Sequence, residues 1–167
     1  MVMERARIFG SGFLKSRSVA MVVGWALLIS LLMIKNHQLF YMENQRFAVY
    51  RIAYDKLQGP MFGDLDWLIL LASSFLVGIF LGSAKKMVYT YFAVVALSFI
   101  IGTIYVYLYN WFVLDLGQMM AYVPFGWEYA LYIAFLSILR FMFPLGMFAC
   151  LVGLVTGSFI AVWARIG

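Results

Sequence analysis

Residues 67–113 decide the fold class, and they read WLILLASSFLVGIFLGSAKKMVYTYFAVVALSFIIGTIYVYLYNWFV. This stretch contains two apolar runs, 67–84 and 87–113, which are separated by Lys85 and Lys86. A helix that crosses the hydrocarbon core of a bilayer needs about 20 such residues. Because the connection between the two runs is so short, they are predicted to form an antiparallel pair of transmembrane helices.

The composition of the whole chain indicates the same class. Of its 167 residues, 66% are hydrophobic and 11% are charged, and the mean hydropathy is +0.97. A soluble domain is about 45–50% apolar and about 25% charged. The high hydrophobicity also excludes an intrinsically disordered chain. We therefore predict an all-α integral membrane protein that contacts membrane lipids.

A further apolar run, 18–34, follows a basic segment and has a signal peptide as its alternative interpretation. The sequence LLMIK at 31–35 offers no small-residue cleavage site, so an uncleaved membrane anchor is expected. This run is predicted to be the first span. It is preceded by a basic tail over 1–17 and followed by an outer loop over 35–66.

The last apolar run, 129–163, is too long for one ordinary span. Its 35 residues would extend about 52 Å as a helix, well beyond a hydrocarbon core of about 30 Å. Pro144 supplies the break, because its ring clashes with the preceding helical turn and it lacks an N–H group. We predict an interfacial or re-entrant helix over 127–139 and a fourth span over 141–163.

Lysine and arginine in the short flanking segments set the predicted orientation. The tail over 1–17, the Lys85–Lys86 turn and the tail over 164–167 together carry seven. The loops over 35–66 and 114–126, with Arg140, carry five. The excess predicts that both termini are cytoplasmic and that the protein lies in the cell membrane.

The first outer loop contains a segment with helical amphipathic periodicity, 43–57. Its apolar side includes four residues that we assign to an interface helix: Phe47, Tyr50, Tyr54 and Leu57. Such a helix lies in the head-group plane or docks on a partner. The alternative is a short helix that only covers the ends of the spans.

Small residues recur every four positions in two of the predicted spans. The candidate helix-packing residues are Ser74, Gly78 and Gly82 in one span, and Ala149, Gly153, Gly157 and Ala161 in the other. This spacing lets helix backbones approach closely within a membrane. The pattern predicts close helix packing and leaves open whether the contact is within one chain or between subunits.

The sequence predicts no catalytic set, metal site or cofactor. The single histidine, His37, could hold a cation together with Glu43, Asp64 or Asp66, but loop acids of this kind are more often simply solvated. The single cysteine, Cys150, lies in an apolar run and is expected to be a small buried hydrophobe. Motifs for nucleophilic, zinc or nucleotide chemistry are missing from the sequence.

Four polar residues near the predicted outer surface are candidates for contact with a lipid or a partner: Asn110, Asp115, Glu128 and Arg140. Three interpretations of Arg140 are open. It is a snorkelling interfacial base, a group that binds an acidic lipid or partner, or a buried gating charge.

These features favour a non-catalytic accessory or scaffold subunit of a multi-subunit membrane complex. Its expected partners are other membrane subunits or further copies of the chain, and not nucleic acid, because most bases flank apolar segments. The first alternative is a small oligomeric channel or carrier that uses Arg140 and Asn110. The second is a lipid-acting membrane enzyme that uses Asp115, Glu128 and Arg140.

Overall fold

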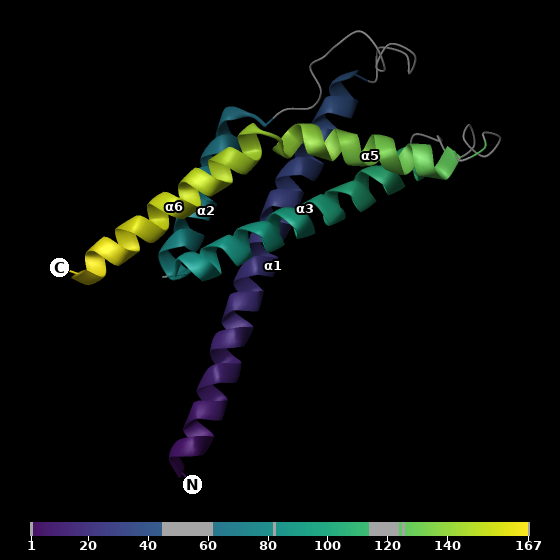
Figure 1. The fold of residues 1–167 in the computed structure, drawn as a ribbon. Coiled ribbons are helices and arrows are strands. Elements are labelled where there is room, and N and C mark those ends of the chain that lie inside the picture. Colours follow the sequence, from purple (N-terminus) through teal and green to yellow (C-terminus); the bar gives the residue numbers. More distant parts are fainter. Residues whose placement is uncertain (1, 45–61, 82, 114–123, 125, 167) are drawn as a thin grey trace.

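A computed structural model describes residues 2–44, 62–81, 83–113, 124 and 126–166, which form five α-helices (Figure 1). The helices are α1 (Val2–Asn44), α2 (Asp64–Leu81), α3 (Ala84–Phe112), α5 (Gly126–Met142) and α6 (Leu145–Ile166). Four of them are long and apolar enough to cross a membrane, over Val19–Phe40, Asp64–Leu81, Lys85–Phe112 and Leu145–Ala164. The predicted all-α membrane fold with four spans is confirmed.

The break in the last apolar run lies at Pro144. Helix α5 continues to Met142, one turn beyond the predicted end at residue 139, and the N–H of Phe143 still bonds to the Leu139 carbonyl at 2.8 Å. Pro144 has no N–H to extend this ladder. Its own carbonyl accepts a bond from the N–H of Phe148 at 3.0 Å, at the start of α6. The peptide bond between Phe143 and Pro144 is cis.

Helices α1 and α3 run side by side in the same direction. Ser98 Oγ donates a hydrogen bond to the Ala26 carbonyl at 3.2 Å. Further along both helices, Gln38 Nε2 donates to the Tyr105 hydroxyl at 2.7 Å. Because the contacts advance together along the two sequences, the helices are parallel.

Helices α2 and α6 form a second parallel pair. A Cβ atom built on Gly153 would lie 2.8 Å from the Leu71 carbonyl oxygen, and one on Gly157 would lie 2.9 Å from the Phe75 carbonyl carbon. The contacts again advance together. An ion pair between Lys35 near the end of α1 and Asp66 at the start of α2 joins the two pairs. The four spans therefore alternate in direction along the chain.

Helix α5 packs lengthwise on the C-terminal half of α3, with the opposite direction (Figure 1). The buried side of α5 repeats every four residues: Gly126, Ala130, Ala134, Ile138 and Met142. Opposite it, Gly102 leaves room for Ile138, whose Cδ1 atom is 3.0 Å from the position that a Cβ would occupy. The helix that the sequence predicts as interfacial or re-entrant is thus held to the bundle along one face.

Two predicted elements fall outside the described residues. Helix α1 ends at Asn44, so the proposed interface residues Phe47, Tyr50, Tyr54 and Leu57 are not described. Asp115 in the second outer loop lies outside the described ranges as well. The proposed interface role of these five residues stays a prediction.

Candidate functional site

A buried carboxylate, Asp66, is the centre of a polar cluster where α1 meets the start of α2. Its side chain is 2% exposed. One carboxylate oxygen accepts a hydrogen bond from Lys35 Nζ. The other accepts bonds from Asn36 Nδ2 at 2.8 Å and from the Gly63 N–H at 3.1 Å. Three donors thus compensate the cost of burying this charge.

Local sequence explains why Asp66 turns back toward Gly63. Gly63 precedes α2, and its carbonyl accepts bonds from the N–H groups of Asp66 and Trp67 at 2.9 and 3.1 Å. An acidic residue three positions after the N-cap residue can bond to that residue's N–H, as in a capping box. Of the two acids in the first turn of α2, Asp64 and Asp66, it is Asp66 that bonds to Gly63. Asp64 is exposed.

Aromatic rings continue the polar cluster onto α3. His37 is 1% exposed and lies edge-on to Tyr105 and Tyr109, with ring centroids 6.0 and 5.4 Å away. The two tyrosine rings stack on each other at 5.9 Å. Tyrosine presents an apolar ring and a polar hydroxyl, so it suits the boundary between lipid tails and head groups.

The position of His37 bears on the alternative of a cation site formed with Glu43, Asp64 or Asp66. Asp66 already binds Lys35 and Asn36, while His37 faces the tyrosines of α3. Within the part of the chain that the structure describes, no group of three His, Cys, Asp or Glu side chains is placed to hold a metal ion. The cluster instead joins α1, α2 and α3 at one end of the bundle.

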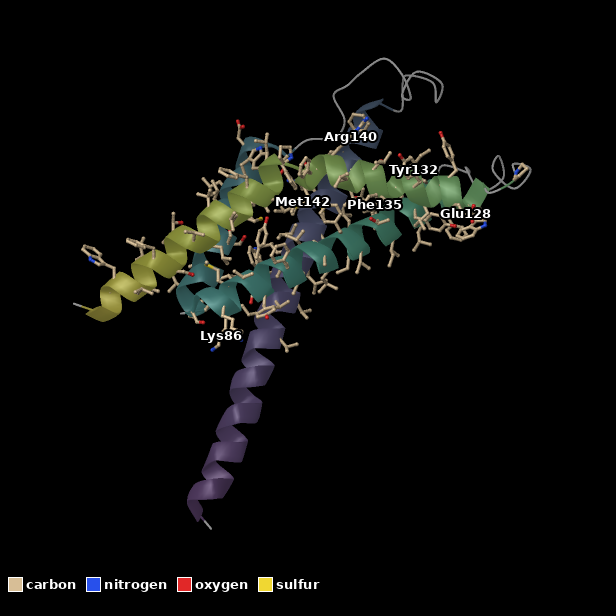
Figure 2. The ribbon with its side chains drawn as sticks, viewed as in Figure 1. Lys86, Glu128, Tyr132, Phe135, Arg140 and Met142 are labelled. Carbon is tan, nitrogen blue, oxygen red and sulfur yellow. The ribbon has the colours of Figure 1, made fainter. Side chains whose placement is uncertain are left out.

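The structure does not bring the candidate outer residues together. Glu128 and Arg140 lie at opposite ends of α5, and both are exposed (Figure 2). Twelve residues of helix separate them by about 18 Å at 1.5 Å per residue. Asn110 lies two turns beyond Gly102 on α3; it is 3% exposed, and its Oδ1 accepts no hydrogen bond from the described residues.

The two small-residue stripes face each other in the α2–α6 pair. A Cβ atom on Gly78 would collide with the Leu154 carbonyl oxygen and lie 3.0 Å from the Ser158 backbone nitrogen. One on Gly153 would collide with Ser74 Oγ. Only glycine permits this separation of the two helices, because the atoms nearest to each Cβ position include backbone atoms of the other helix. Of the other stripe residues, Ala161 is buried, Ala149 is half-buried and Gly82 is not described.

Serine hydroxyls within the spans bind backbone carbonyls at helix contacts. Ser158 Oγ donates to the Gly78 carbonyl at 3.0 Å, from α6 to α2. Ser74 Oγ donates to carbonyls of its own helix, including that of Leu71 at 3.1 Å. Similarly, the Tyr91 hydroxyl joins α3 to α6 by donating to the Met147 carbonyl at 3.1 Å.

Sequence reasoning missed two parts of this arrangement. The sequence-based prediction treated Lys35 and Asn36 only as loop residues. A lysine at the end of one span, followed by an acid at the start of the next, could have indicated an ion pair. The third small-residue stripe, Gly126, Ala130 and Ala134, has the same four-residue spacing as the two stripes that were identified. Aromatic residues around it hid the pattern.

No protein-family model, curated protein or solved structure matches this chain at a significant level. The candidate residues are therefore assigned from burial, distance and charge.

Proposed function

We propose that the chain is a non-catalytic accessory or scaffold subunit of a multi-subunit complex in the cell membrane. One observation carries this proposal: polar side chains on the spans bond to other helices of the same chain. Ser98, Ser158 and Tyr91 each donate to a backbone carbonyl of another helix of the same chain. Such bonds fix the helices relative to one another, as suits a rigid support for partner subunits.

A carrier needs helices or helix pairs that move relative to one another. Here the glycines of the α2–α6 contact bring backbone against backbone, and the Asp66 cluster joins that pair to α1. The channel or carrier alternative also needs Arg140 and Asn110 on one pathway. Arg140 is exposed near the end of α5, whereas Asn110 is buried two turns beyond the Gly102–Ile138 contact. This separation favours the scaffold.

We further propose that both termini are cytoplasmic. The alternating helix directions put the Lys85–Lys86 turn on the same side as the start of α1 and the end of α6. Seven of the twelve lysines and arginines lie in these segments. Basic residues in short loops stay preferentially on the cytoplasmic side.

Purification in mild detergent tests the proposed function. We expect the chain to co-purify with unrelated membrane subunits at fixed stoichiometry by native mass spectrometry, and we expect those subunits to become less abundant when the chain is deleted. The chain alone in liposomes should conduct no ions. A homo-oligomer that conducts ions would contradict the proposal and support a channel. A solitary monomer whose loss leaves every other membrane protein unchanged would also contradict it.

A further inference from the structure

An open groove of about 560 Å³ runs along the exposed side of the α2–α6 pair. The residues that shape it include Asp64, Trp67, Leu71 and Ala72 of α2, with Gly153 and Thr156 of α6. Small side chains at 72 and 153 make it concave.

The groove wall is apolar, and its charge is confined to one end. The Thr156 hydroxyl donates to the carbonyls of Val152 and Gly153 at 2.8 and 2.9 Å, so its hydrogen-bonding capacity is directed to its own helix. Asp64 is the one charged residue among those that line the groove. As the first residue of α2, it lies at the end of the span that carries the polar cluster around Asp66.

The groove wall is apolar along its length and carries its charge at one end, which is the distribution of polarity in a phospholipid. An acyl chain is far thinner than a helix, and its apolar surface matches the wall.

The charge of Asp64 at the end of the groove then selects the lipid head group. Asp64 is exposed, while the neighbouring Asp66 is already bonded to three donors. A primary ammonium both attracts a carboxylate and donates hydrogen bonds to it. A trimethylated ammonium donates none, and an anionic head group is repelled. We propose that the α2–α6 groove binds an acyl chain of a phospholipid with a primary-amine head group, such as phosphatidylethanolamine, and that Asp64 contacts the amine.

Bromine quenching of Trp67 fluorescence tests this site. The full-length chain is placed in phosphatidylcholine nanodiscs that contain a minor fraction of lipid with brominated acyl chains. The head group of the brominated lipid is ethanolamine, choline or glycerol. The chain has five tryptophans, so the Trp67→Phe variant supplies the background from the other four. We expect the brominated ethanolamine lipid to occupy the site roughly two- to fivefold more than the choline lipid, the preference expected from an exposed ion pair.

Two variants separate the head-group contact from the chain contact. Asp64→Asn should abolish the ethanolamine preference, whereas Lys86→Gln, which removes an exposed charge at the opposite end of the spans, should preserve it. Ala72→Phe should reduce quenching by all three lipids because it fills the groove, and Ala96→Phe on the exposed side of α3 should not. Equal quenching by the three lipids, or an ethanolamine preference that survives Asp64→Asn, would overturn the proposal. Trp67 that is quenched by none of them would overturn it too, and would point to a partner helix across the groove.

Discussion

Replacing Gly157 by leucine should separate α2 from α6 and lower the thermal stability of the protein in detergent. A Cβ atom at this position would collide with the Phe75 carbonyl oxygen and lie 2.9 and 3.1 Å from the carbonyl carbon and Cα of the same residue. Backbone of a packed helix moves only if the helices part. Overpacking of this kind costs about 1–3 kcal/mol or more.

For a chain of this length, that loss corresponds to a decrease of about 3–10 °C in Tm. Thermal unfolding followed by circular dichroism measures it. Val155→Leu is the matched control, since Val155 lies on the same helix and is 45% exposed. If the two variants melted at the same temperature, the small-residue stripe of α6 would face lipid and not α2.

Replacing Asp66 by asparagine should give the second large effect. The side chain keeps its size but loses its charge, and its amide group then faces the donors of Lys35, Asn36 and Gly63. Removing one partner of a buried ion pair costs about 3–5 kcal/mol. Lys35 is 46% exposed and can turn toward water or head groups, so we expect about 3 kcal/mol, the lower end of that range.

Unfolding by titration with a denaturing detergent measures this change in the free energy of unfolding. Glu128→Gln serves as the control, because Glu128 is also an acid in the first turn of a helix but is exposed. Equal stability of the two variants would mean that the Asp66 cluster does not hold α1 against α2.

The number of spans could be predicted from the sequence because it depends on local quantities. A run such as 87–113 is apolar and long enough by itself, and Pro144 has no N–H to continue the hydrogen-bond ladder of a helix that precedes it. The ends of the elements were less accurate. Helix α5 reaches Met142 and not residue 139, because the N–H of Phe143 still finds the Leu139 carbonyl.

The pairing of the helices depends on contacts between residues far apart in the chain. The four-residue spacing around Gly78 or Gly153 indicates that a helix has a face of small side chains, but it does not identify the helix that packs against that face. For Asp66 too, the sequence indicates only a local role: its position in the first turn of α2 suits a helix cap. Its bonds to Lys35 and Asn36, which are 31 and 30 residues away, could be identified only from the structure.

The pairing of α2 with α6 within one chain is tested most directly by disulfide cross-linking. A Cβ built on Gly153 lies 3.0 Å from the Ser74 Cβ, so the two helices need to part by only about 0.5 Å to reach the separation of about 3.5–4.5 Å in a disulfide. Ser74→Cys and Gly153→Cys are combined in a Cys150→Ser background, oxidised in the membrane and analysed by gel electrophoresis and intact mass. The structure predicts a disulfide within a single 19.1 kDa chain, which neither single variant can form. Cross-linking only into a dimer would contradict it.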